Sequence, residues 1–207
     1  MSKPDINESL SILGFTENCI VETLLVSSNP DGSPNIAPMG ITRCEDSLIV
    51  KAYKTSQTYE NLSRGGSVSV NVSSDPLMFL KTAFKQEYGQ PPELVIKADA
   101  VIQADITGHI HEDNIRASFK LSPINIEIKN TTPKVFSRGR AIAIDLIINA
   151  TRLQVHTEEK RDLEVMIIAD KMRENIEIIN KVSMEGTAEQ KVVEAIRSLS
   201  NKWGVDL

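Results

Sequence analysis

The segment from 54 to 61, KTSQTYEN, carries the densest group of side chains that could bind a ligand. Hydroxyl, amide and ammonium groups come together in and just before it: Lys51, Lys54, Thr55, Ser56, Thr58 and Asn61. Hydroxyls, amides and the start of a helix are the groups that bind a phosphate monoester. The same residue types are common helix caps, so the segment alone leaves a phosphate site and a plain cap both open.

A second feature is the pair of prolines in the stretch PNIAPMGI, from 34 to 41. Pro34 and Pro38 fall inside what otherwise reads as a strand. Each proline removes a hydrogen bond from the ladder, so this strand should lie at a sheet edge or be bulged. Backbone N–H groups near Gly40 and Ile41 would then be free to face a ligand.

Other signals for catalysis or metal binding are weak. The sequence has no GxSxG, HExxH, Walker A or GxGxxG motif, so no catalytic residue is predicted. His109 and His111 alternate and would share one face of a strand, but a third metal ligand is missing, so a solvated strand face is preferred and no metal is predicted. Cys19 and Cys44 are expected to be small buried apolar residues.

Three polar residues interrupt the apolar run from 141 to 153: Asp145, Asn149 and Arg152. Their spacing places them on one narrow face of a predicted buried helix. A buried carboxylate and guanidinium are costly unless they are paired. We therefore expect an internal ion pair that ties this helix to the barrel or to a second subunit, with direct ligand contact as the alternative.

The elements that must position these residues come in the order strands first, helices last. The pattern predicts six strands at 19–28, 34–43, 47–53, 67–73, 97–111 and 116–130. A turn at 29–32 should join the first two strands, with Gly32 at positive φ. A short helical turn closed by Gly65 and Gly66 should follow the third strand.

Helices are predicted after the fourth strand and at the C-terminal end. The first begins at Asp75 and Pro76, with Leu77, Leu80, Phe84 and Tyr88 on one face. The others cover 140–153, 159–182 and a stretch capped by Thr187, with Gln190 reaching back. This order predicts an α+β protein, a β-barrel or sheet that carries a C-terminal helical layer.

Composition narrows the class of protein. The 207 residues are 41% hydrophobic and 25% charged, with a formal net charge of −5, which is ordinary for a globular protein. A pI of 5.3 without a dense Lys/Arg block argues against nucleic acid as the main partner. We expect no signal peptide and no membrane span. Two cysteines without a CxxC pair exclude a disulfide scaffold and indicate a reducing cytoplasm.

Three stretches together resemble the FMN-binding split-barrel superfamily, which includes flavin reductases and pyridoxamine phosphate oxidases. They are ETLLVSSNPDGSPNIAPMG, SQTYENL and RGRAIAIDLIINATRL. The first resembles the opening hairpin, the second the phosphate-binding loop, and the third the start of a C-terminal helical extension. This extension is found in a mainly archaeal group of uncharacterised members. The resemblance covers residues 10–155 well and the last fifty loosely.

The resemblance implies a split barrel at 1–138 and a helical extension at 139–207, packed on the barrel or at a dimer interface. It also implies a homodimer with FMN at the subunit interface. The implied cofactor-binding residues fall in two groups. The phosphate group comprises Ser56, Gln57, Thr58 and Asn61. The ring group comprises the chain at Met39, Gly40 and Ile41, while Lys51 would add charge near the phosphate or the ring.

The predicted function is a redox-active FMN-binding flavoprotein, similar to a flavin reductase, with an unknown substrate. The sequence has no nicotinamide fingerprint and no dedicated acid or base, so enzymatic turnover is left open. The alternatives are a module that binds flavin without turnover and a dimeric barrel with a structural role. In the structural alternative the segment from 54 to 61 is only a helix cap.

Overall fold

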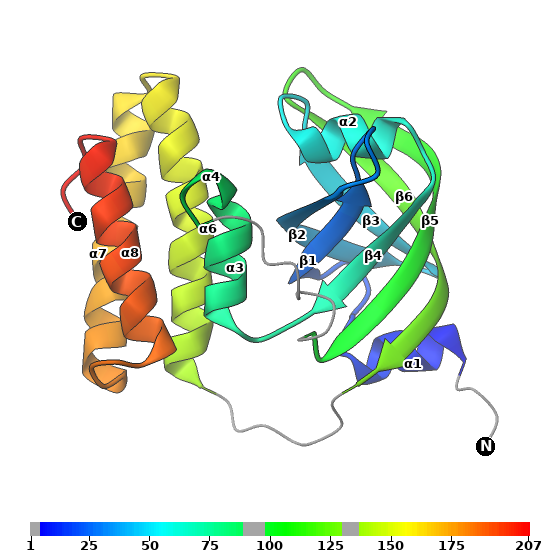
Figure 1. Cartoon of the computed structure of the whole chain (residues 1–207), viewed down its shortest axis with the longest axis horizontal. Coiled ribbons are helices and arrows are strands. Elements are labelled where there is room, and N and C mark those ends of the chain that lie inside the picture. The colour runs from blue at the N-terminus through cyan, green and yellow to red at the C-terminus, as the bar shows by residue number, and fades with distance from the viewer. Residues whose placement is uncertain (1–4, 89–97, 130–136) are drawn as a thin grey trace. The chain divides into compact units, whose positions relative to one another are not determined.

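The computed structural model describes residues 5–88, 98–129 and 137–207. Its fold is α+β, as the order of elements predicted, and it divides into two compact units (Figure 1). The barrel unit comprises residues 1–73 and 92–132, and the helical unit comprises residues 74–91 and 133–207. The structure therefore groups 74–91 with the C-terminal helices, whereas the sequence-based division at 138/139 assigns this stretch to the barrel.

Six antiparallel strands close the barrel in the order β1-β2-β3-β6-β5-β4. They are β1 (Ile20–Ser28), β2 (Pro34–Cys44), β3 (Ser47–Tyr53), β4 (Ser67–Val72), β5 (Ala100–Glu112) and β6 (Arg116–Ile128). The predicted strands are confirmed to within a few residues at each end, and Gly32 has the expected positive φ of 81°.

Alternation along each strand builds the barrel core. On β3, Leu48, Val50 and Ala52 are buried in the core, while Lys51 between them is exposed. Such a period of two is typical of a strand with one face on a core and the other in solvent. The helix α1 (Ile6–Ile12) and the loop after it add Leu10 and Phe15 to the same core.

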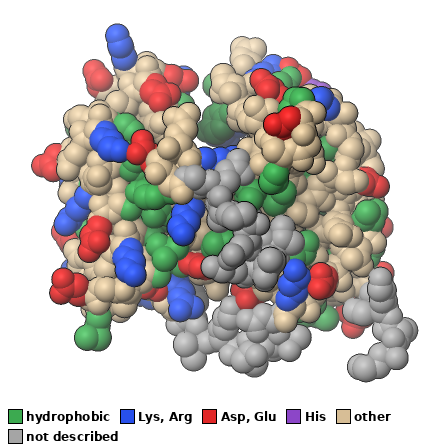
Figure 2. Space-filling model, in the orientation of Figure 1, with side chains coloured by type: hydrophobic (Ala, Val, Ile, Leu, Met, Phe, Trp, Pro, Cys, Tyr) green, Lys and Arg blue, Asp and Glu red, His purple; other side chains and the backbone are tan. Residues whose placement is uncertain are grey.

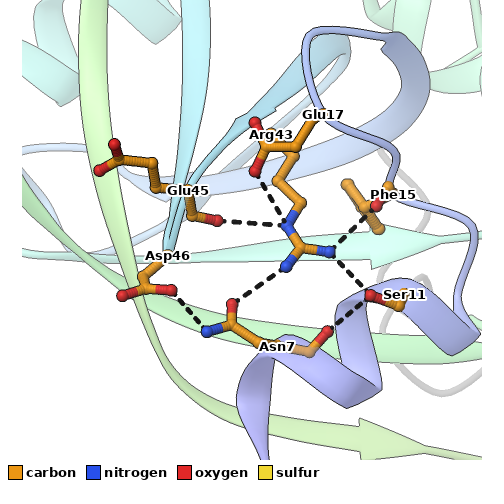
Figure 3. Close-up of polar contacts among 7 residues, drawn as sticks. All are labelled: Asn7, Ser11, Phe15, Glu17, Arg43, Glu45 and Asp46. Carbon is orange, nitrogen blue, oxygen red and sulfur yellow. Dashed lines mark hydrogen bonds and ion pairs between the residues drawn. The ribbon is translucent and has the colours of Figure 1, made fainter.

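Arg43 holds α1 and its loop against the β2–β3 hairpin (Figure 3). Its guanidinium donates to Ser11 Oγ at 2.9 Å, Phe15 O at 3.2 Å, Asn7 Oδ1 at 3.2 Å and Glu45 O at 3.2 Å, and it lies 3.7 Å from Glu17 Oε1. The Arg43 side chain is only 13% exposed. One side chain on β2 therefore fixes the segment that closes one end of the core.

The helical unit contains α3 (Pro76–Ala83), α4 (Lys85–Tyr88), α6 (Arg138–Glu158), α7 (Asp162–Val182) and α8 (Ala188–Lys202). Helix α6 contacts α3, α7 and α8, and Leu146, Ile147 and Ala150 on it are fully buried. Because three helices of its own unit surround α6, its apolar character does not require a second subunit. In the described part of the chain no helix is long and apolar enough to cross a membrane.

The capping predictions are confirmed in part. Asp75 Oδ1 accepts from Leu77 N at 2.9 Å, and Thr187 Oγ1 accepts from Gln190 N at 3.4 Å. The Gln190 side chain does not reach back to the cap, because its amide donates to Ser183 O and Asn180 Oδ1. Tyr88 is exposed, against expectation.

The reason for the exposed Tyr88 is a break in the helix. The backbone leaves the helical conformation at Phe84, where φ is −116° and ψ is 58°. The short helix α4 therefore does not continue the apolar face of α3. The predicted apolar face therefore stops at Phe84, which is buried.

The expected ion pair of Asp145 with Arg152 is wrong. Arg152 is exposed, so its own charge is solvated and needs no buried partner. Asp145 Oδ2 instead accepts from the buried Asn149 at 3.1 Å and from the buried Asn175 of α7 at 2.8 Å. Lys171 Nζ lies 4.0 Å away. The polar group therefore joins α6 to α7 within the helical unit.

Candidate functional site

Helix α2 (Gln57–Ser63) follows β3 and begins at a serine cap. Ser56 Oγ accepts from Tyr59 N at 3.1 Å and donates to Tyr53 O at 2.7 Å. The first backbone bond of the helix runs from Glu60 N to Ser56 O at 3.3 Å. The N–H groups of Gln57 and Thr58 therefore precede the helical ladder, as the first amides of any helix do.

Thr58 and Asn61, two predicted phosphate ligands, are buried at 4% and 3% exposure. Asn35 Nδ2 on β2 donates to Thr58 Oγ1 at 3.1 Å and lies 3.3 Å from Ser27 Oγ on β1. Asn61 Nδ2 donates to the same Ser27 Oγ at 3.0 Å. These side chains bind the β1–β2 hairpin, and so they position α2 on the barrel.

Three further contacts complete this network at Asn61. Its Oδ1 accepts from Gln57 Nε2 at 3.0 Å and from Arg64 Nη2 at 2.7 Å. Its Nδ2 also donates to Asn29 Oδ1 at 3.0 Å. The Asn61 amide is thus occupied by protein partners on both of its polar atoms.

Sequence reasoning did not single out Ser27, Asn35 or Arg64. Ser27 and Asn35 pair directly across the β1–β2 ladder, and both are buried. A polar residue at an inward position of each of two apolar strands was the available signal, since buried polar groups need partners.

The open edge predicted from the prolines is present on β2. All of Pro34 to Thr42 pairs with β1, but only Ile41 to Cys44 pairs with β3. Residues 34–40 therefore have no ladder on the β3 side. Ile41 is a correction, because it pairs with strands on both sides and its backbone lies inside the sheet.

The alternation of the backbone decides which groups face the open edge. A proline is tolerated in a ladder only where its nitrogen points away from the partner strand. The nitrogens of Pro34 and Pro38 must therefore point away from β1, and Gly40, two residues further on, turns its N–H to the same side. The Gly40 N–H therefore lies on the side of β2 that has no ladder at this position, as the proline pattern predicts.

Gly40 leaves room for side chains of the neighbouring strand β1. A Cβ placed there would lie 3.0 Å from Ile20 Cγ2, which is tighter than most contacts, and 3.6 Å from Glu22 Oε1, which is an ordinary contact. The neighbouring Met39 side chain packs against the barrel core, so only its backbone can face the outer surface. The backbone of Met39 and Gly40 therefore lies at the free edge of β2, beside the side chains of Ile20 and Glu22.

Lys51 lies on the outer face of β3, opposite Ser118 of β6, and is exposed. Lys54 is engaged elsewhere, in an ion pair with Glu112 at the end of β5. The hydrogen bond from Lys54 is the main cause that lowers the pKa of the Glu112 carboxyl, and nearby His109 lowers it further.

The predicted site residues fall in one region of the barrel unit. Beyond Ile41 and Val50 the strands β2 and β3 no longer pair, and α2 contacts both of them as well as β1. The edge at Met39 and Gly40 borders this opening on one side. Lys51 lies on the other side, and the chain from Ser56 to Asn61 continues beyond it. A strand edge with a backbone N–H, a lysine and a helix start form a donor set that fits a phosphorylated flavin.

The predictions for histidine and cysteine need correction. A register shift lies between His109 and His111, which pair with Phe119 and Ser118 respectively. These two partners are neighbours on β6 and face opposite sides, so the histidines do not share a face. His109 stacks on Phe119 with ring centroids 5.1 Å apart. Cys19 and Cys44 are exposed, because both lie at strand ends rather than inside the sheet.

No group of three or more potential metal ligands occurs within the described ranges.

Comparison with known proteins gives a family and a fold. Residues 21–130 match the family model described as "Protein of unknown function (DUF447) N-terminal domain". No curated protein matches. An FMN-bound protein from Methanosarcina mazei, assigned to the same family model, is similar at a TM-score of 0.72 and 22% identity, over 91% of this chain and 98% of that one.

Two other solved structures match at lower scores. Flavoredoxin from Methanosarcina acetivorans has a TM-score of 0.43 and 20% identity, over 53% of this chain and 68% of that one. The styrene monooxygenase flavin reductase from Pseudomonas putida has a TM-score of 0.42 and 12% identity, over 60% and 87%. The similarity to the Methanosarcina mazei structure confirms the predicted barrel with its C-terminal helices at the level of the fold.

Proposed function

We propose that this chain, which belongs to the DUF447 family, is a redox-active flavoprotein that binds FMN. The observation that carries the proposal is the opening between β2 and β3, bordered by the free edge at Gly40, by Lys51 and by the start of α2. The Methanosarcina mazei protein of the same fold, which is FMN-bound, supports the choice of cofactor. The single phosphate of FMN fits the start of α2, whereas the adenylate half of FAD would need further contacts.

We assign the cofactor contacts as follows. The N–H groups of Gln57 and Thr58, with Ser56, hold the phosphate, and the chain at Met39 and Gly40 lies along the ring. Lys51 supplies a positive charge that would stabilise an anionic reduced ring. The cofactor itself accepts and donates electrons when bound. Thr58 and Asn61 act by fixing α2, since both side chains are already occupied.

The proposal includes the assembly and the compartment. A second copy of the chain would cover the open edge of β2, since unpaired edges are usually covered, and FMN would lie at that interface. The division into a barrel domain at 1–138 and a helical extension at 139–207 stays a prediction. Free, exposed cysteines support a reducing compartment such as the cytoplasm.

A structural role is the second candidate. It is favoured by one observation, that the side chains of Ser56, Thr58 and Asn61 all have protein partners. On this interpretation the segment from 54 to 61 is a cap that closes the barrel, and no ligand is needed.

Equilibrium titration separates these candidates. FMN should bind more tightly than riboflavin and FAD, and sedimentation of the FMN-loaded protein should give twice the chain mass of 22.9 kDa. Failure to bind any flavin would support the structural role. Anaerobic addition of NADH or NADPH should bleach the flavin, whereas a bound flavin that no donor reduces would indicate a module without turnover. A monomer with stoichiometric FMN would contradict the interface location.

A further inference from the structure

The turn between β5 and β6 contacts the chain just before α2. Lys54 N donates to Ile115 O at 3.0 Å, and the Lys54 ammonium pairs with the Glu112 carboxylate. The guanidinium carbon of Arg116 lies 4.2 Å from the centroid of the Tyr53 ring, and its Nη2 donates to the Tyr53 hydroxyl. The β5–β6 turn therefore holds Tyr53 and Lys54 by a backbone hydrogen bond, an ion pair and a stacked side chain.

Asp113 fixes the shape of this turn. Its Oδ1 accepts from Ile115 N at 2.7 Å and from Arg116 N at 2.6 Å, and its own N–H donates to Arg116 O at 2.9 Å. An aspartate that accepts from backbone N–H groups two and three residues further on stabilises a tight turn. The two residues that Asp113 holds, Ile115 and Arg116, are the ones that contact Lys54 and Tyr53.

Hydrogen bonds connect Tyr53 in turn with the start of α2. Its carbonyl oxygen accepts from Ser56 N at 2.9 Å and from Ser56 Oγ at 2.7 Å. Ser56 Oγ also accepts from Tyr59 N at 3.1 Å, so the hydroxyl that caps the helix is oriented by the Tyr53 carbonyl. The N–H groups of Gln57 and Thr58, which we assign to the phosphate, follow directly in the chain.

The ion pair is the weakest of these links. The side chains of Lys54 and Glu112 are 29% and 37% exposed. Figure 2 shows both positive and negative side chains on the visible surface at the end of the barrel unit where α2 lies. Exposed ion pairs contribute little to stability because water screens them. We therefore assign the main effect to the backbone bonds of the turn, which depend on Asp113.

We propose that Asp113 is a positioning residue for the phosphate end of the flavin site, acting through the β5–β6 turn on Tyr53 and Ser56. The inference rests on the proposed function, because it concerns the amides that we assign to the FMN phosphate. A hydrogen bond to a charged acceptor depends strongly on the alignment of donor and acceptor. A turn without its aspartate would leave the start of α2 less well aligned and would weaken the binding of the phosphate.

Paired titrations with FMN and riboflavin test the effect on the phosphate. Asp113→Ala should weaken FMN binding about tenfold and riboflavin binding less than about twofold, because only FMN carries the phosphate. Asp113→Asn keeps a side-chain oxygen that can accept in the turn, and it should restore most of the difference. The matched control is Asp75→Ala, which removes the carboxylate that accepts from Leu77 N at the start of α3. It should leave the ratio of the two affinities unchanged.

Hydrogen exchange in the flavin-free protein tests the link between the turn and α2. The amides of Lys54 and Ser56 should exchange faster in Asp113→Ala, because their acceptors, Ile115 O and Tyr53 O, are less well held. Their exchange should be unchanged in Asp75→Ala. Unchanged exchange in Asp113→Ala, or equal losses of FMN and riboflavin binding, would overturn the inference while leaving FMN binding intact. An unmodified protein that binds no flavin would instead overturn the proposed function, and with it the role of Asp113 toward the phosphate.

Discussion

Asn35 and Thr58, 23 residues apart, are joined by a hydrogen bond from Asn35 Nδ2 to Thr58 Oγ1 at 3.1 Å, and both side chains are buried. This bond connects the beginning of β2 with the first turn of α2. The β1–β2 hairpin, which borders the candidate ring site, thus also holds the segment that is predicted to bind the phosphate. The two parts of the candidate site are therefore held in a fixed position relative to each other.

Asn35→Ala should lower the free energy of unfolding by about 1–3 kcal/mol, because Ser27 and Thr58 lose a buried partner. Urea unfolding followed by far-UV circular dichroism measures the change. Asn201→Ala, at an exposed position near the end of α8, is the control and should be close to neutral. A stability of Asn35→Ala equal to that of the control would contradict the anchoring role.

The double substitution Ser56→Ala with Thr58→Ala should weaken FMN binding by two orders of magnitude or more. Ser56→Ala removes the hydroxyl that we assign to the phosphate, and a hydrogen bond to a charged acceptor is worth about 1.5–3 kcal/mol. Thr58→Ala removes the bond from Asn35 Nδ2 that fixes the first turn of α2. Riboflavin, which lacks the phosphate, should bind nearly as before. Parallel titrations with both flavins measure the ratio. Equal losses for the two flavins would show that the loop does not act on the phosphate, and lower stability with unchanged selectivity would support a plain cap.

Arg43→Ala should loosen α1, because the guanidinium joins Asn7, Ser11 and the Phe15 carbonyl to β2. We expect a loss of about 2–4 kcal/mol, the scale of several charged hydrogen bonds that share one donor group. Hydrogen exchange should become faster at the Leu13 amide, which donates to Ser9 O at 3.0 Å. Arg43→Lys keeps the charge but loses the planar guanidinium, so its stability should lie between those of Arg43→Ala and the unmodified protein. An unchanged hydrogen-exchange rate at the Leu13 amide in Arg43→Ala would contradict the role of Arg43 in holding α1.

Asp113 should make the barrel more sensitive to acid. Backbone hydrogen bonds from Arg116 N at 2.6 Å and Ile115 N at 2.7 Å lower the pKa of its carboxyl below the ordinary value of 3.8. A pKa lowered by folding means that the ionised group stabilises the fold above pH 3.8, and that this stabilisation is lost as the pH falls through the folded pKa.

Asp113→Asn should therefore be less stable than the unmodified protein near neutral pH, and the difference should shrink below pH 3.8. Urea unfolding at a series of pH values measures it, and carboxyl titration by NMR gives the pKa directly. A titration midpoint for Asp113 at or above 3.8 would exclude this explanation.

The sequence alone determined the local elements of this protein. Period-two alternation, the turn at Gly32 and the caps at Asp75 and Thr187 depend on residues close together in the chain, and these predictions are confirmed. The open edge at β2 was predictable for the same reason, since Pro34 and Pro38 cannot donate to a ladder whatever the partner strand is.

Tertiary structure decided which polar side chains are free. Thr58 and Asn61 appear as ligand donors in the sequence, but the closed barrel brings Ser27 and Asn35 to them, 23 to 34 residues away along the chain. Arg152 was expected to pair with Asp145, but packing of α6 against α7 gives Asp145 an asparagine partner and leaves Arg152 in solvent. A register shift in β5 separates His109 from His111. Each of these outcomes depends on contacts between distant segments, which residue type and spacing do not encode.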